Sequence, residues 1–415
     1  MTNAEHLTQS IKLSFSPYQK FVVGILAFLQ FTVILDFMII SPLGAIVMPA
    51  LQISTHEFGL AVSAYAFSAA ISGIAAAGFA DRFDRKRLLL FFYGGFILGT
   101  ALCAVAPTYH FLLGARVVTG LFGGVIGSVV LAIAADLFPL EMRGRVMGFV
   151  QTAFAGAQVL GLPAGIYLAG LWTWHSPFVA IIAIAVPASL VIALYMKPVA
   201  GHLKAKQEHS AWRHLARTIF EPKYTPAFVG IMALTTGGYM IMPFLSTFIV
   251  NNIGIPLRNL PTIYLVTGLC TVFVGPMVGK ASDRFGKFRT FLFGTVVTLI
   301  MIAVYTNLGP TSLLTVIIVN ALLFAGIFSR LIPAQALFSS VPEATQRGSF
   351  NAIMASLQQF SGGIASAFAG LILVQNSAGQ LQHFDWMGYI VMATALLSLA
   401  LIYLVHRAVP EGLAS

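Results

Sequence analysis

Charged side chains are scarce in this sequence. Asp, Glu, Lys and Arg together make up 9% of the 415 residues, against about 25% in an ordinary soluble domain. So few charges cannot cover a surface that faces water, and hydrophobic residues account for 58% of the chain. The composition therefore excludes an ordinary soluble domain and predicts an all-α membrane protein that lies mostly in the lipid bilayer.

Cysteine is scarce too. The two cysteines, Cys103 and Cys270, fall inside apolar runs in opposite halves of the chain, so neither a structural disulfide nor a cysteine metal site is expected. The sequence also lacks a nucleophile elbow, a phosphate-binding loop and a zinc-protease helix. We therefore expect no enzyme, no metal and no cofactor. Without a nucleotide-binding motif, the energy source would have to be an ion or solute gradient.

Apolar runs long enough to cross a bilayer recur along the whole chain. Because a crossing takes about 20 residues, the pattern predicts twelve transmembrane helices. The first six are expected at 19–46, 56–79, 88–106, 109–135, 146–170 and 176–196. The second six are expected at 224–250, 260–280, 290–308, 312–337, 348–373 and 386–406. Ser54 and Glu57 predict a capping box at the start of the second span. The polar residues 1–20 lack the signal-peptide layout, so the first span is expected to be retained.

Two stretches of the first half return in the second half. Asp81-Arg82 reappears as Asp283-Arg284, 202 positions later (283 − 81). The segment 139–144, with proline, arginine and glycine in the same order, returns at 342–348. A repeat of this length in so apolar a chain is typical of a transporter. It predicts two pseudo-symmetric six-helix bundles at 1–196 and 224–415, joined by a basic linker at 197–223.

The positive charges predict the orientation. If the N-terminus is cytoplasmic, all but three of the 23 Lys and Arg residues fall on the cytoplasmic side. The exceptions are Arg258, in an opposite-side loop, and Arg116 and Arg330, inside predicted spans. Since basic residues favour cytoplasmic loops, both termini and the linker are expected to be cytoplasmic. This bias accounts for the formal charge of +10 without a nucleic-acid partner.

The linker contains three histidines, His202, His209 and His214. One interpretation is a solvated linker or an amphipathic helix on the membrane surface. The other is a metal site, which we do not favour, because the spacing is not that of a helical ligand pair.

Asp36 is the one carboxylate predicted deep inside a span. It lies about 16 residues into the first span, or about 24 Å along a helix. A carboxylate at such depth is unfavourable in lipid and by default indicates a functional site. Arg116, in the outer half of the fourth span, is its natural partner. We favour a proton-coupling role for Asp36 with Arg116, and the alternative is a structural ion pair between the first and fourth spans.

Arg330 is a second buried cation. It lies in the tenth span, about 8 residues from its cytoplasmic end. It could line a central cavity, where it would favour an anionic or oxygen-rich substrate, or extend toward the membrane surface. Tyr239 and Gln158 also lie inside spans, and each could bind a ligand or form an interhelical hydrogen bond.

Several of these segments resemble the major facilitator superfamily, and within it the proton-coupled drug and metabolite exporters. The loop 77–87 is similar to the family signature, with Ala77 and Asp84 in place of its glycines. The segment 116–123 resembles the family's arginine motif, which is linked to proton transfer. Residues 156–165 resemble the antiporter motif, with the proline displaced by one position as in sugar-efflux-like members. Leu35-Asp36 resembles the acidic position of many exporters.

The resemblance implies roles for further residues. Asp81 would cap the helix that begins near Arg347, and Arg85 would reach Asp136. Such contacts would form a conformational latch that stabilises the outward-open state. The latch residues implied in this way are Asp81, Arg82, Arg85, Asp136, Asp283 and Arg284. The resemblance also implies that spans one, four, seven and ten surround one chamber. The substrate-cavity residues would then be Asp36, Arg116, Tyr239 and Arg330, and Gln158 of the fifth span is a further candidate.

These observations predict a secondary active transporter of the bacterial inner membrane. It would export a small organic molecule, a drug or a metabolite, in exchange for protons by alternating access, with the proton gradient as its energy source. The alternatives are a symporter or uniporter of a small polar or anionic solute and, less favoured, a transporter-like membrane receptor. The lipid bilayer, protons and a small-molecule substrate are the expected partners, and a monomer is the expected state.

Overall fold

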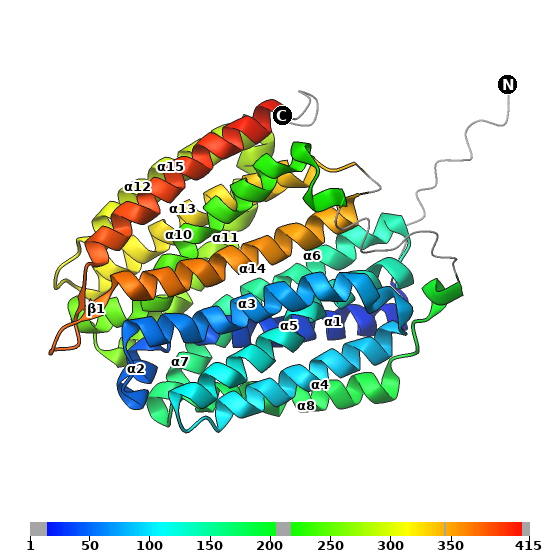
Figure 1. Cartoon of the computed structure of the whole chain (residues 1–415), viewed down its shortest axis with the longest axis horizontal. Coiled ribbons are helices and arrows are strands. Elements are labelled where there is room, and N and C mark those ends of the chain that lie inside the picture. Colours follow the sequence, from blue (N-terminus) through cyan, green and yellow to red (C-terminus); the bar gives the residue numbers. More distant parts are fainter. Residues whose placement is uncertain (1–14, 205–216, 344–345, 409–415) are drawn as a thin grey trace.

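Long helices that run roughly alongside one another make up almost the whole molecule (Figure 1). The computed structural model describes residues 15–204, 217–343 and 346–408. Within these residues, eleven helices are long and apolar enough to cross a membrane. The prediction of an all-α membrane protein is confirmed.

The helices form an N-terminal bundle, α1–α8, and a C-terminal bundle, α10–α15. The N-terminal bundle contains α1 (Pro17–Ile39), α2 (Gly44–Leu51), α3 (Thr55–Phe79), η1 (Ala80–Arg82), α4 (Arg85–Ala104), α5 (Tyr109–Leu137), α6 (Leu140–Gly156), the π-helical η2 (Ala157–Gly161), α7 (Leu162–Leu171) and α8 (Ser176–Tyr195). The segment η3 (Gly201–Lys204) follows it. The C-terminal bundle contains η4 (Pro222–Tyr224), α10 (Thr225–Thr247), η5 (Phe248–Asn252), η6 (Leu257–Asn259), α11 (Leu260–Phe285), α12 (Lys287–Thr306), α13 (Leu313–Ser339), α14 (Arg347–Ile372) and α15 (Phe384–Ala408).

The predicted span at 348–373 forms the helix α14, which is not among the eleven apolar candidates. Its polar residues Asn351, Gln358 and Gln359 lower the hydropathy of this helix. It is nevertheless 26 residues long and packs between α3 and α10 (Figure 1). The count of twelve spans, and the placement of both termini, stay predictions.

Two features differ from the prediction. The first span, expected as one segment at 19–46, ends at Ile39 and is followed by the separate short helix α2. Pro42 lies in the break, where its ring removes a backbone donor that a continuous helix would need. A small antiparallel hairpin also follows α14, with Val374–Gln375 (β1) paired to Leu381–Gln382 (β2). Its turn contains Gly379 at φ +78°.

Local sequence signals explain several helix ends. The predicted capping box is confirmed: the Ser54 backbone N–H donates to Glu57 Oε2 at 2.8 Å, and the Glu57 N–H donates to Ser54 Oγ at 3.3 Å. The two copies of the repeated loop turn differently. Gly286 ends α11 at φ +93°, which favours glycine. In the first copy Asp84 takes this place at φ −56° and instead caps α4, accepting from the Arg87 N–H at 2.9 Å.

The helices α3 and α14 form the main contact between the two bundles and lie side by side, antiparallel (Figure 1). Ser63 Oγ donates to the Gly363 carbonyl at 2.7 Å, and small residues let the two backbones approach closely. The start of α3 meets the end of α14, where Thr55 Oγ1 donates to the carbonyls of Gly370 and Leu373. We call this the sealed end of the molecule. We call the opposite end, which carries Asp81 and Asp136, the latch end.

Candidate functional site

A cavity of about 550 Å³ lies between the two bundles. Its wall is formed mainly by α1, α6 and η2 on one side and by α10, α11 and α13 on the other. The lining is mostly apolar, with hydroxyl groups and several glutamines. Those glutamines are Gln30, Gln151, Gln158, Gln335 and Gln358. Among the described residues that line the cavity, Arg330 is the one charged side chain and there is no carboxylate.

The cavity is open toward the latch end. Gln151 of α6 and Gln335, which lies in the half of α13 near that end, are exposed. Toward the sealed end, Val62, Leu245 and Tyr264 are buried in the wall. The structure thus has a central chamber with access from one end.

Asp36 and Arg116 form an ion pair inside the N-terminal bundle. Arg116 Nη1 donates to Asp36 Oδ2 at 2.9 Å, and both side chains are fully buried. The second carboxylate oxygen, Oδ1, accepts a hydrogen bond from Thr100 Oγ1 at 3.1 Å. The predicted pairing is therefore present and links α1, α4 and α5. Sequence reasoning missed Thr100, because a threonine in an apolar span gives no signal of its own.

The ion pair lies behind the cavity wall and not in it, because neither Asp36 nor Arg116 is among the lining residues. The guanidinium of Arg116 lies over the ring of Tyr65, 4.7 Å from its centroid. Phe37, the residue after Asp36, lines the cavity and contacts the Tyr65 ring at a centroid distance of 5.1 Å. A thin aromatic layer therefore separates the pair from the chamber.

Tyr239 and Gln158 do line the cavity, and each also makes a hydrogen bond. The Tyr239 hydroxyl donates to Gln359 Oε1 at 2.9 Å. Gln158 accepts at Oε1 from Thr271 Oγ1 of the opposite bundle at 2.9 Å. Gln158 lies in the π-helical turn η2, and such turns are frequent at functional sites. Substrate binding by these two residues stays a prediction.

Arg330 lies on the cavity wall with its side chain 5% exposed. Its Nη2 donates to Ser398 Oγ at 2.6 Å, and the guanidinium lies 5.6 Å from the centroid of the Phe291 ring. Its Nε is buried without a hydrogen-bond partner among the described residues. The predicted placement at the cavity holds, and no carboxylate pairs with this arginine in the described chain.

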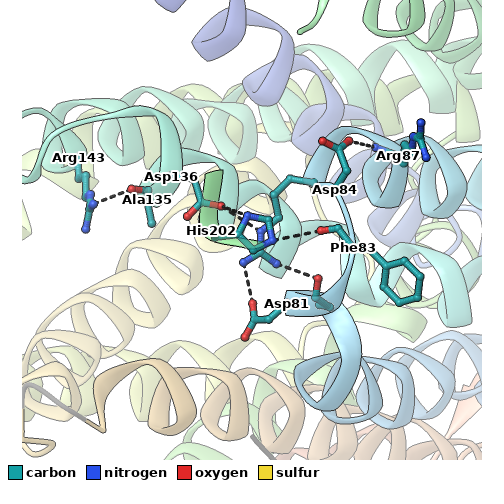
Figure 2. A network of polar contacts seen from close by, with 10 residues as sticks. Asp81, Phe83, Asp84, Arg87, Ala135, Asp136, Arg143 and His202 are labelled. Carbon is teal, nitrogen blue, oxygen red and sulfur yellow. Dashed lines mark hydrogen bonds and ion pairs between the residues drawn. The ribbon is translucent and has the colours of Figure 1, made fainter. Parts of the chain in front are cut away.

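Arg85 organises a polar cluster at the latch end (Figure 2). Its Nη2 donates to Asp81 Oδ1 at 2.6 Å, and its Nε donates to Asp136 Oδ2 at 3.1 Å. The predicted Arg85–Asp136 contact is therefore formed. His202, from the predicted linker, joins the cluster, with Nδ1 3.2 Å from Asp136 Oδ2 and Nε2 3.2 Å from the Phe83 carbonyl. Sequence reasoning missed His202, because only the folded path of the linker brings it here.

A second pair at this end belongs to the C-terminal bundle. Lys223 Nζ donates to Glu343 Oε1 at 2.7 Å. This hydrogen bond from the ammonium group holds the pKa of Glu343 below its usual range.

The other predicted latch contacts are not formed in this structure. Asp81 bonds with Arg85, and the N-terminus of α14 has no side-chain cap. Arg82, Asp283 and Arg284 are exposed and form no ion pair with any described residue. A metal site at the linker histidines is not tested, since His209 and His214 lie outside the described residues. Within the described residues no cluster could hold a metal.

Replacing Arg85 with glutamine is expected to lower the free energy of unfolding by about 1.5–3 kcal/mol, the usual range for hydrogen bonds to a charged partner. The change removes donors from Asp81, Asp136 and the Ala80 carbonyl together. Thermal unfolding in detergent measures the effect. Arg82→Gln is the matched control, because Arg82 is exposed and forms no ion pair with the described residues. Equal unfolding temperatures for the two variants would contradict the expectation.

Two bundles of apolar helices around a partly polar central chamber define a multi-pass membrane transport protein. The family model of the Major Facilitator Superfamily matches residues 26–366 and 227–414. The chain belongs to this superfamily, and it is a transporter and not an enzyme.

Curated relatives and solved structures agree with this assignment. The chain is 24% identical over 385 residues to the uncharacterized MFS-type transporter YbcL of Bacillus subtilis (strain 168), covering 92% of this chain and 95% of the relative. It is 25% identical over 364 residues to multidrug resistance protein 2 of the same organism, covering 86% and 89%. A bacterial homolog of the human lysosomal transporter Spinster, crystallised in an inward-facing, unoccupied conformation, has the same fold. Its TM-score is 0.76, with 14% identity and coverage of 95% and 98%.

Proposed function

We propose that this protein is a proton-coupled antiporter that exports a small organic molecule across the inner membrane by alternating access. One observation carries the proposal. Asp36 is the only carboxylate in the interior of a described membrane span, and it is buried in an ion pair one aromatic layer from the central cavity. A carboxylate that can take up and release a proton at such depth in a membrane span by default indicates a functional site. The relative named multidrug resistance protein 2 supports a drug or a similar small organic molecule as the substrate.

Proton binding would act through the ion pair. When Asp36 Oδ2 takes up a proton, the carboxyl group becomes neutral and its attraction to Arg116 Nη1, 2.9 Å away, is largely lost. Arg116 would then be a buried cation without a counter-charge, because its Nε and Nη2 already lack partners among the described residues. A conformation that gives Arg116 another partner would then be favoured. Protonation can shift the equilibrium between two states only by such a differential interaction.

The positive-inside bias would place the latch end in the cytoplasm, since the basic loops with Arg85, Lys86 and Arg87 lie there. The conformation described here would then be open to the cytoplasm and sealed on the outside. Alternating access would require the contacts at the sealed end to open while contacts at the latch end form. Asp81 and the uncapped N-terminus of α14 lie at that end, and an anion at a helix N-terminus is favourable. The implied latch contact would belong to the outward-open state.

A symporter or uniporter of a small polar or anionic solute is the second candidate. Asp36 and Arg116 have no solvent exposure and do not line the cavity. A purely structural ion pair between α1 and α5 would have this geometry as well.

Substrate-triggered proton movement in liposomes separates the two candidates. The purified protein is reconstituted with a pH-sensitive dye in the lumen, and cationic drugs, sugars and organic anions are added outside. An antiporter releases protons from the lumen as the substrate enters. Substrate uptake without a pH change would identify a uniporter, and proton entry together with the substrate would identify a symporter.

A further inference from the structure

The two arginines that are buried in the interior of membrane spans, Arg116 and Arg330, have different partners. Arg116 has a carboxylate at 2.9 Å, whereas the side-chain hydrogen-bond partner of Arg330 among the described residues is the neutral hydroxyl of Ser398. Among the described residues from 217 onward, the acidic residues Glu221, Asp283, Glu343 and Asp385 lie at helix ends or in loops. No ion pair joins any of these described acids to Arg330. A guanidinium stays charged at every physiological pH, so its charge is unmatched in this conformation.

Arg330 lies in the wall of the chamber. It borders the central cavity and also a small side pocket of about 20 Å³ between α10, α12, α13 and α15. Its Nε is buried and has no hydrogen-bond partner in the described chain, so one donor of its planar fork is left unsatisfied. A carboxylate matches this fork in shape and charge, because two of its oxygens can accept parallel N–H bonds.

The rest of the wall is suited to an uncharged, partly aromatic body. Phe37, Phe154 and Phe328 offer apolar faces, while the five glutamines offer amide donors and acceptors. The volume of about 550 Å³ is that of an ordinary small-molecule site. A cation would find no carboxylate in the described lining and would be repelled by Arg330.

We propose that the transported molecule is a small amphipathic organic anion whose carboxylate binds to Arg330. This inference rests on the proposed transport function and adds the substrate class to it. It also has an electrical consequence. If one anion leaves for each proton that enters, both movements carry charge in the direction that an inside-negative potential favours.

Three probes of nearly equal size test the charge preference: 1-naphthoate, 1-naphthamide and 1-naphthylmethylammonium. Their affinities are measured by equilibrium binding to the purified full chain in detergent. We expect naphthoate to bind at least tenfold more tightly than the amide, and the ammonium compound to bind most weakly. In Arg330→Gln the preference for naphthoate over the amide is expected to disappear while amide binding is kept. In Arg330→Lys an intermediate preference is expected, since the charge remains but the fork is lost.

Arg258→Gln is the matched control. It removes the same charge from an exposed position in η6, outside the cavity, and should leave the preference unchanged. The thermal unfolding temperature tests the alternative that Arg330 has a purely structural role. Removing an unmatched buried cation should leave Arg330→Gln at least as stable as the wild type, whereas loss of a structural arginine would lower its unfolding temperature.

Three results would overturn the assignment. They are tightest binding of the ammonium probe, an unchanged naphthoate preference in Arg330→Gln, and no binding of naphthoate at millimolar concentration. Failure of the antiport proposal is distinguishable from these. A protein that binds naphthoate through Arg330 but moves no protons in liposomes would contradict the antiport and leave the anion site standing.

Discussion

Asp36→Asn is expected to abolish substrate-driven proton movement. The substitution keeps the shape of the side chain and its contact with Thr100 but removes the group that can take up a proton. If the pair couples transport to protons, the pH signal in dye-loaded liposomes should fall to the level of empty liposomes. Substrate binding should persist, because Asp36 does not line the cavity.

The same change also affects stability, which must be separated from coupling. With asparagine at position 36, Arg116 is left as a buried cation without its partner, and breaking one side of such a pair typically costs about 3–5 kcal/mol. The double variant Asp36→Asn/Arg116→Gln replaces both charges with neutral amides that can hydrogen-bond to each other. Since replacing both members of a buried pair is often nearly neutral, we expect the double variant to unfold close to the wild-type temperature.

The double variant therefore gives the decisive measurement. It should be folded and able to bind substrate, yet silent in the proton assay. If it still moves protons with its substrate, Asp36 is not the coupling group. The double variant and the wild type could also transport substrate at the same rate, with no pH change in either. In that case the ion pair is structural and the protein is a facilitator.

The sequence predicted this ion pair but not its surroundings. The depths of Asp36 and Arg116 in their spans follow from counting residues along two helices, and their opposite charges make pairing the favourable arrangement in lipid. Which face of α1 meets the chamber depends on how the helices rotate when they pack. In the structure Phe37 faces the cavity, and Asp36 points into the bundle beside Thr100. The rotation is a tertiary property, so the aromatic layer between the pair and the cavity could not be predicted.

The latch end was predicted in part for a similar reason. Arg85 and Asp136 lie at the ends of neighbouring helices, and the family resemblance was enough to bring them together. His202 reaches the same cluster because the chain after α8 folds back: the Arg85 backbone N–H donates to the Val199 carbonyl at 3.0 Å. Such a path leaves no periodic pattern in the sequence. The polar residues of α14 likewise explain why a helix expected as a span is not among the eleven apolar candidates.

Gly59→Val is expected to open the sealed end and to reduce transport by about tenfold or more. A Cβ atom at Gly59 would lie 2.6 Å from the Ser366 carbonyl oxygen of α14, a backbone atom that cannot rotate away. The two helices must then separate where the bundles meet. Overpacking of this kind costs about 1–3 kcal/mol, and each 1.4 kcal/mol changes an equilibrium about tenfold. The cost falls only on the conformation that is closed at this end.

The labelling rate of a cysteine placed at Ser41 reports the shift. Ser41 lines the cavity near the sealed end and is half-buried, so in a background without Cys103 and Cys270 a membrane-impermeant maleimide added outside cells should react slowly with Ser41→Cys. Adding Gly59→Val should raise that rate. Gly148→Val in α6 is the control, because a Cβ there meets no atom within 4 Å.

A transporter must visit both conformations in each cycle, so a variant held open at one end should still bind substrate but fail to move it. This pattern separates a shifted equilibrium from a damaged fold. A misfolded Gly59→Val variant would lose binding together with transport and would unfold at a lower temperature than Gly148→Val. Retained binding, fast labelling at Ser41→Cys and lost transport are the joint expectation. Unchanged labelling with full transport would mean that the close approach of α3 and α14 at Gly59 is not the barrier that closes the chamber.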